Sequence, residues 1–369
     1  MNKNISSKQI GFYAHSVCQG LAMIINSLPG DYNLVLFARK DLTRNLTDHK
    51  VAFPFLENYH KLTILDHSNN LEMEFDTLYI TWTHWIKFSK EEIKFLNLRL
   101  KKARRIVLLY DAQFGSFWQR LRQQIRNLIT NFQLIRSLDE ICYMTVYPAV
   151  DLFALFRRRY CLTVGPKLEY LFIQENMDYL CRDYEIKNKR GVFLIVSGER
   201  ASSSYRQELV EYLSLALKSC DNYNLIEQAH DDSGNKKDVL WLIDRKRFIL
   251  DKEYAGILEN TDFTLCFNGT SWTTRPFEAL LRGSIPILGE DVLRFYDLKW
   301  ENGKNCIIVR APDKKESWLD AINRAAEFTQ EKIKELRGNI YQLRKEYLLP
   351  EAFRKRLSLK LGYELNYEL

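Results

Sequence analysis

The chain has 369 residues, which is too long for one ordinary core and suits two domains of about 150 to 200 residues each. Apolar residues make up 46% and charged residues 27%, which is typical of a folded protein and excludes a disordered one; no segment has the roughly 18 apolar residues of a membrane span. The net charge of +7 suits an anionic substrate or membrane surface, and we expect no nucleic-acid partner.

The seven cysteines are odd in number and widely spaced, and no two form a CxxC motif. This pattern favours free thiols in a reducing compartment over a disulfide framework or a zinc site. The first residues contain no apolar run of signal-peptide length. We therefore expect a cytoplasmic chain, or the soluble part of something longer, with peripheral contact at the inner face of the membrane as a further option.

In the first half, short apolar runs alternate with amphipathic stretches, and one helix is expected early, over Cys18–Leu28. Strands alternating with helical patterns predict a parallel sheet with helices on both faces. The predicted strands are Gln9–Ser16, Tyr32–Arg39, Thr77–His84, Arg105–Ala112 and Asp139–Val146.

A mixed segment follows, and then a second series of the same kind opens. Its predicted helix is Tyr205–Ser219, and the chain is largely helical and charged from Ser317 on. The predicted fold is α/β, with two doubly wound Rossmann-like domains facing across a cleft: residues 1–165 and 191–345, a linker at 166–190 and a helical segment at 346–369. The predicted strands of the second series are Gly191–Arg200, Val239–Asp244, Asp262–Phe267, Ser284–Gly289 and Asn305–Arg310.

The stretch from Thr261 to Asp291 carries the chemistry. Its strand ends in a loop of small residues, and a helix begins near Thr274 or Pro276, where proline suits the first helical position. A helix N-terminus after such a loop binds anions, and Arg275 at the same end can fork onto a phosphate. The loop residues are Asn268, Gly269, Thr270 and Ser271.

Glu278 comes three residues after Arg275 and so lies on the same helical face. Its carboxylate cannot help to bind phosphate, but it can accept hydrogen bonds from the hydroxyls of a ribose. The helix closes at Gly283, and the following strand returns to the same edge, where Glu290 follows it. We interpret the loop as a diphosphate site with a ribose acceptor; the alternative is an ordinary strand-to-helix loop beside a surface ion pair.

These residues resemble the carboxyl-terminal half of GT-B glycosyltransferases, most closely the exostosin-like family, over roughly Gly191–Arg310. That family shows a short apolar strand, a small-residue loop, an arginine, Glu-Ala-Leu, the sequence small-Gly-x-Ile-Pro-Val-Ile and an acidic loop. It usually carries Cys-Pro before the loop glycine, where this chain has Cys266-Phe267-Asn268. The matching residues are Phe263–Ser271, Arg275, Glu278–Leu280, Gly283–Leu288, Glu290 and Asp291, with Phe295–Trp300 similar to the family's following stretch.

The resemblance implies a transferase that moves a sugar from a nucleotide-sugar donor, a UDP-sugar, to a growing glycan with inversion, with residues 191–345 binding the donor. No Asp-x-Asp motif occurs, so neither a metal nor another cofactor is expected. Eukaryotic exostosins carry a membrane anchor and none is visible, which favours a bacterial-type enzyme of surface polysaccharide or lipopolysaccharide synthesis. Besides the loop, Arg275, Glu278 and Glu290, the expected donor-binding residues are Gly198, Glu199, Arg200 and Arg206.

Residues 1–165 are expected to bind the acceptor and to supply the base that takes its hydroxyl proton. His15, Asp111 and His84 each end a predicted strand, where a base would reach the cleft, although a lone histidine is more often structural. Glu199 is an outside candidate for the same role.

Phe117–Arg136 has an apolar stripe at helical spacing and four arginines. A basic amphipathic helix of this kind can lie on an anionic membrane, which would suit a lipid-linked glycan acceptor. The alternative is an ordinary domain helix packed on the sheet.

Three other functions compete with this interpretation. They are a fucosyltransferase-like enzyme that uses a GDP-sugar, a nucleotide-sugar epimerase on the same fold, and a non-catalytic protein that binds glycans or membranes.

Overall fold

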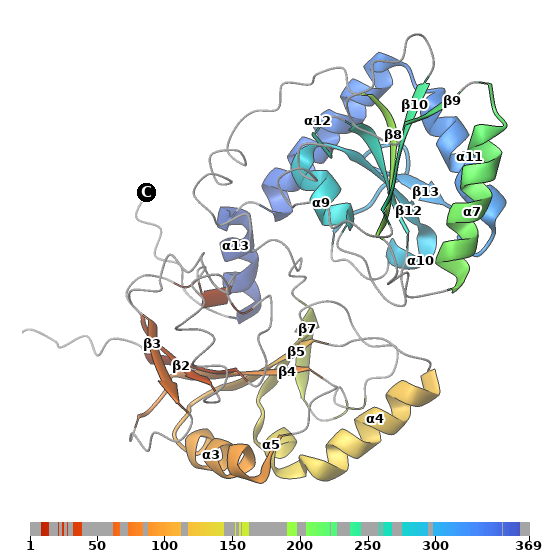
Figure 1. Cartoon of the computed structure of the whole chain (residues 1–369). Coiled ribbons are helices and arrows are strands. Elements are labelled where there is room, and N and C mark those ends of the chain that lie inside the picture. The colour runs from red at the N-terminus through yellow and green to blue at the C-terminus, as the bar shows by residue number, and fades with distance from the viewer. Residues whose placement is uncertain are drawn as a thin grey trace, which may run out of the picture. The chain divides into compact units, whose positions relative to one another are not determined.

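The computed structural model forms two compact units, Met1–Tyr179 with Pro350–Leu369, and Leu180–Leu349 (Figure 1). No helix in its described part is long and apolar enough to cross a bilayer. The residues described are 9–14, 21, 24–25, 28, 32–38, 62–66, 73–83, 88–111, 117–143, 152, 155, 157–161, 190–197, 204–221, 223–226, 237–244, 258–259, 261–267, 275–293, 298–348 and 350–361.

The first unit is built on a seven-stranded sheet in the order β3-β2-β1-β4-β5-β6-β7, and every pairing in it is parallel. From the central strand β1 the chain runs outward through β2 and β3, then crosses to β4 on the other side. This reversal is the topological switch point of a doubly wound sheet. The strands are β1 Gln9–Ala14, β2 Asn33–Ala38, β3 Leu62–Asp66, β4 Thr77–Thr83, β5 Ile106–Asp111, β6 Glu140–Tyr143 and β7 Arg158–Cys161.

Both faces of this sheet are buried, which explains the continuous apolar runs of its central strands. Tyr13, Ile80 and Leu108 point to the face covered by α3 (Lys90–Leu100) and α5 (Phe132–Ser137), as alternation along a strand requires. A capping box between Ser89 and Glu92 starts α3, and the buried Glu92 carboxylate also accepts the Tyr13 hydroxyl at 2.7 Å. The helix is thereby fixed to the central strand.

The second unit has a six-stranded parallel sheet in the order β13-β12-β11-β8-β10-β9. Here β10 rather than β9 lies next to the first strand, so the order differs from that of the first sheet. The switch point falls between β8 and β11. The strands are β8 Arg190–Ser197, β9 Tyr223–Ile226, β10 Lys237–Asp244, β11 Thr261–Cys266, β12 Ile285–Gly289 and β13 Ile307–Val309.

Helices cover both faces of the second sheet: α7 and α11 lie on one side, and α9 and α12 on the other (Figure 1). On α12 the buried Arg337 pairs with Asp262 at the start of β11. The helices of this unit are α7 Ser204–Lys218, α9 Arg275–Arg282, α10 Glu290–Leu293, α11 Lys315–Ala326 and α12 Gln330–Tyr347.

The α/β prediction with two parallel sheets is confirmed, but some elements differ from the sequence-based ones. The continuous helix predicted over Phe117–Arg136 is wrong at Asn131, whose φ of −123° and ψ of 28° separate α4 (Phe117–Thr130) from α5. The strands β3, β7 and β9 were not predicted. All three lie at a sheet edge, where one side of the strand has no neighbour in the sheet and the apolar signal is weak.

Candidate functional site

The candidate site lies along the carboxyl edge of the second sheet, beside the switch point between β8 and β11. In register, Cys266 of β11 pairs with Leu288 of β12, and Gly289 of β12 pairs with Val309 of β13. The segments that leave these strands therefore start side by side. In a doubly wound sheet this edge is where ligands bind.

The helix α9 begins at this edge with Arg275 and carries Glu278 in its first turn. Both side chains are half-buried. Phe277, which lies between them in the sequence, and Leu280, which follows, are buried in the core. The helix ends at Gly283, which has the left-handed φ of 69° that a glycine tolerates, and the Ser284 amide closes the end by donating to the Ala279 carbonyl at 2.9 Å. The amphipathic pattern of α9 therefore places Arg275 and Glu278 on the face that is not packed in the core.

The charges of Arg275 and Glu278 both act on the thiol of Cys266. Burial raises the pKa of Cys266 well above its ordinary value; the charge of Arg275 acts to lower that pKa, and the charge of Glu278 acts to raise it. Because α9 connects two neighbouring parallel strands, β11 and β12, its first turn lies toward the carboxyl end of β11. The structure thus places Arg275 and Glu278 one turn apart at the start of α9, and their role in donor binding stays a prediction.

Glu290 follows β12 directly and opens the short helix α10. Its carboxylate accepts a hydrogen bond from the Ala311 amide at 3.1 Å. Ala311 has a φ of 53°, an unusual conformation for a residue with a side chain. This carboxylate, for which the sequence predicts a role in donor binding, therefore holds the turn after β13.

The same turn is fixed from α7 and α11. The Pro312 carbonyl accepts two donors, the Tyr205 hydroxyl from the first turn of α7 and the Trp318 indole N–H at 3.0 Å. Burial raises the pKa of Tyr205, and the nearby carboxylates of Asp313, Asp291 and Glu316 raise it further against the opposing effect of the Trp318 contact. Three carboxylates therefore lie close to the Tyr205 hydroxyl at this end of the edge.

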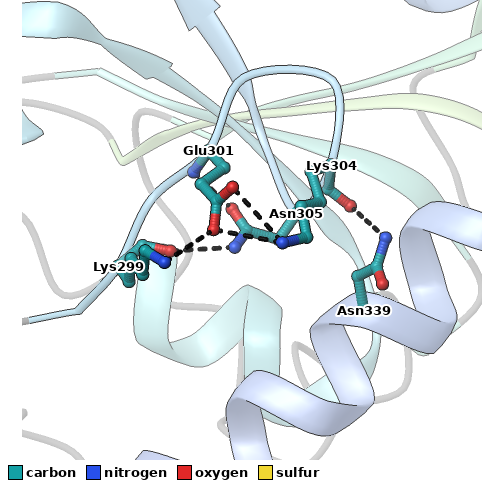
Figure 2. A network of polar contacts seen from close by, with 5 residues as sticks. All are labelled: Lys299, Glu301, Lys304, Asn305 and Asn339. Atoms are coloured by element: carbon teal, nitrogen blue, oxygen red, sulfur yellow. Dashed lines mark hydrogen bonds and ion pairs between the residues drawn. The ribbon is translucent and has the colours of Figure 1, made fainter.

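Beneath the edge, a turn between α10 and β13 is held by side-chain amides and charges (Figure 2). Asn305 accepts the Glu301 amide and donates to the Lys299 carbonyl, both at 2.9 Å, while Asn339 of α12 donates to the Lys304 carbonyl at 2.9 Å. The turn carries Trp300, which packs against the buried cluster of Cys266, Leu288 and Cys306. The network therefore fixes the turn that carries Trp300 and, through Trp300, supports the buried residues near the carboxyl ends of β11 and β12.

The candidate bases of the first unit follow three neighbouring strands. The strands β1, β4 and β5 pair in parallel, so their carboxyl ends share one edge. Asp111 is the last residue of β5, paired with Thr83 of β4. His15 and His84 come directly after β1 and β4 and lie outside the described residues.

Other predicted site residues also fall outside the described part of the chain, and they follow β8 and β11, the two strands at the second switch point. Arg206 belongs to α7, and the structure describes its backbone only. The residues outside are Gly198, Glu199 and Arg200 after β8, and Asn268, Gly269, Thr270 and Ser271 after β11.

Sequence reasoning missed three contributors to this edge, namely Tyr205, Ala311 and Pro312. Tyr205 opens a predicted helix after a predicted edge loop, and this position was a usable signal. The left-handed Ala311 carries no signal, because alanine rarely adopts that conformation and glycine is the usual marker. In the described residues, no group of three or more His, Cys, Asp or Glu side chains could hold a metal ion.

No model of a known protein family matches the chain, and no curated protein matches it in sequence. Solved structures do match it in fold. A glycosyltransferase from Rickettsia africae is 10% identical, with 97% of this chain and 100% of that one covered and a TM-score of 0.54. HepE from Anabaena, solved in complex with UDP-glucose, is 11% identical, with 96% of this chain and 99% of that one covered and a TM-score of 0.52.

An α,α-trehalose 6-phosphate synthase from Burkholderia multivorans is 10% identical over 98% and 100% of the chains, also with a TM-score of 0.52. Coverage of both chains is nearly complete in all three cases, so the likeness includes both sheets. The chain has a GT-B fold, α/β with two parallel sheets. Membership of the exostosin-like family is not shown by any of these matches.

Proposed function

We propose that this protein is a glycosyltransferase that transfers a sugar from a nucleotide-sugar donor to a glycan acceptor. One observation carries the proposal: Arg275 and Glu278 lie half-exposed on one face of α9, at the carboxyl edge beside the switch point of the second sheet. A cation at a helix N-terminus and a carboxylate one turn later suit a diphosphate and a ribose together. The fold, shared over nearly the whole length with glycosyltransferases, supports sugar transfer over other nucleotide chemistry.

In this proposal the N-terminus of α9 and Arg275 bind the diphosphate and stabilise its charge as it departs. Glu278 accepts hydrogen bonds from the ribose, and Glu290 holds the turn at Ala311 that borders the sugar. The donor is a UDP-sugar, a choice supported by the UDP-glucose bound to HepE. Arg200, Arg206 and the loop Asn268–Ser271 complete the donor site.

Inverting transfer needs a base on the acceptor side, and His15, Asp111 and His84 are the proposed candidates because they follow neighbouring strands of the first sheet. The acceptor is a growing glycan of a bacterial surface polysaccharide or lipopolysaccharide. This part rests on the sequence resemblance.

A panel of nucleotides and nucleotide sugars tests the donor and separates the competing functions. We expect UDP and UDP-sugars to raise the melting temperature, and one UDP-sugar to release UDP when a glycan acceptor is added. Stabilisation by GDP alone would favour a fucosyltransferase-like enzyme. Conversion of the donor sugar without acceptor would favour an epimerase, and no response to any nucleotide would favour a non-catalytic protein.

A further inference from the structure

The helix α4 exposes large apolar side chains on the surface of the first unit. The exposed fraction is 74% for Ile129 and 60% for Phe132, the first residue of α5, and Ile125 is also exposed. Gln124 of the same helix is buried at 4%. A helix that packs on a core normally buries its apolar side chains and exposes its amides, and α4 shows the reverse at these positions.

A contact of Gln124 explains why α4 turns this face toward the protein and its isoleucines toward solvent. Its side-chain carbonyl accepts the amide of Leu152 at 2.7 Å, which anchors this face of α4 to the segment before β7. Because Ile125 and Ile129 are four residues apart, they form one ridge along the outer side of the helix. Figure 1 shows α4 running outward from α5 at the border of the unit. The apolar stripe is therefore held toward solvent by a specific contact.

Basic side chains flank this ridge. Arg122 and Arg126 are exposed and again four residues apart, and Arg136 of α5 is exposed as well. No acidic residue occurs between Asp111 and Asp139. The nearest carboxylate along the chain beyond Asp139 is Glu140, which pairs with Arg105 at 2.5 Å. From here on, the name α4 ridge covers both the apolar and the basic residues of this surface, four from α4 and two from α5: Arg122, Ile125, Arg126, Ile129, Phe132 and Arg136.

We propose that the α4 ridge docks this protein on the surface of an anionic lipid bilayer. Isoleucine and phenylalanine side chains enter the boundary between headgroups and acyl chains, while arginines beside them meet lipid phosphates. The α4 ridge itself contains three arginines and no carboxylate. This composition favours an anionic bilayer over a protein partner or a second copy of the chain, because a protein surface would have to place acidic groups against each arginine, whereas a bilayer requires only a strip of basic and apolar side chains. This inference is independent of sugar transfer, since docking needs neither donor nor acceptor.

Co-sedimentation of the full chain with lipid vesicles tests the proposal. The parent protein should pellet with vesicles that contain about a third phosphatidylglycerol and stay in solution with pure phosphatidylcholine. The double variant Arg122→Gln/Arg126→Gln should lower the partition coefficient by about 30-fold, since each basic residue near an anionic surface contributes about fivefold. The variant Ile129→Ser should also bind more weakly, and at high salt as well as at low salt.

A matched control comes from α13 (Pro350–Leu361), whose Leu359 has the same 74% exposure as Ile129 and whose Lys355 and Lys360 are exposed. The variants Leu359→Ser and Lys355→Gln/Lys360→Gln should bind vesicles like the parent. Equal losses in both sets, equal binding to neutral vesicles, or no binding by the parent would overturn the proposal. So would concentration-dependent self-association that disappears in Ile129→Ser, because the ridge would then join copies of the chain.

Discussion

Gly289 ends β12 at the candidate site and has no room for a side chain. A Cβ placed there would lie 2.8 Å from the Cβ of Pro312 and would also meet Asp291 Oδ1. We expect Gly289→Ala to lower the free energy of unfolding by about 1–3 kcal/mol, because the proline ring cannot move aside without disturbing the turn after β13. Urea unfolding followed by circular dichroism measures the change.

Gly338 provides the contrast within the same unit. It lies inside α12, and a Cβ there would meet nothing within 4 Å. Gly338→Ala should therefore raise the free energy of unfolding by about 0.5–1 kcal/mol, as expected for alanine in a helix interior. Equal effects of the two substitutions would contradict the crowding inferred at Gly289.

Two thiols beneath the site should be unreactive in the folded protein. Burial raises the pKa of Cys306 to about 12 and that of Cys266 well above its ordinary value, so neither forms a thiolate near pH 8. We expect iodoacetamide to modify Cys220, which is partly exposed, and to leave Cys266 and Cys306 unmodified until the protein unfolds, as read by mass spectrometry of peptides. Rapid modification of Cys266 at pH 8 would show that the edge of β11 is open.

The raised pKa values also determine how the stability of the folded protein changes with pH. The thiol of Cys306 is protonated in the folded protein up to about pH 12, whereas in the unfolded chain it ionises near 9. Its contribution to stability is complete below pH 9 and is lost as the pH rises toward 12. Tyr223, whose pKa burial raises to about 12 from 10, acts in the same direction.

At this scale the sequence located Arg275 and Glu278 because the pattern of a strand, small residues and an amphipathic helix leaves few choices for their position. It could not locate the contact between Glu290 and Ala311, since that pairing joins residues 21 apart through a backbone amide. Nor could it show that Tyr205 and Trp318 converge on one carbonyl. Such contacts depend on tertiary packing, and they produce no periodic pattern in the sequence.

Among the elements, α12 and β11 are joined by the buried pair of Arg337 and Asp262. Arg337→Met should lower the free energy of unfolding by about 3–5 kcal/mol, because the Asp262 carboxylate loses the partner that offsets its burial. Adding Asp262→Leu should recover a large part of this loss. The exposed pair of Lys332 and Glu335 is the control, and Lys332→Met should change stability by less than about 1 kcal/mol.

Central strands were easier to predict than edge strands, for a physical reason. β11 and β12 are buried on both faces; β12 is a continuous apolar run, and β11 contributes the apolar residues Phe263, Leu265 and Cys266. β7 begins with two arginines, of which Arg158 is exposed, and it borders the sheet. β13 is also an edge strand, but its Ile-Ile-Val sequence made it visible. The exchange of β9 and β10 relative to the first sheet carries no sequence signal, because order depends on pairing in space.

At the scale of the whole molecule, the last helix is grouped with the first unit. Pro350–Leu369 belongs with Met1–Tyr179, although the chain reaches it only after completing the second unit. A chain ending at Leu349 should therefore lose hydrogen-exchange protection in β1 to β6 and keep it in β11 and β12. Loss of protection confined to the second sheet would contradict this grouping. The domain boundaries at residues 165 and 191 remain predictions.

The central claim is that α9 presents a nucleotide site at the edge of the second sheet, and calorimetric titration of UDP into matched variants tests it most directly. Arg275→Ala and Glu278→Ala should each weaken binding by about 10- to 100-fold, consistent with loss of a hydrogen bond to a charged group. Arg282→Gln removes a charge at the other end of α9, where Arg282 pairs with Glu259 at 2.6 Å, and should bind UDP like the parent. If all three variants keep their fold and bind UDP and other nucleotides as the parent does, the site assignment is contradicted.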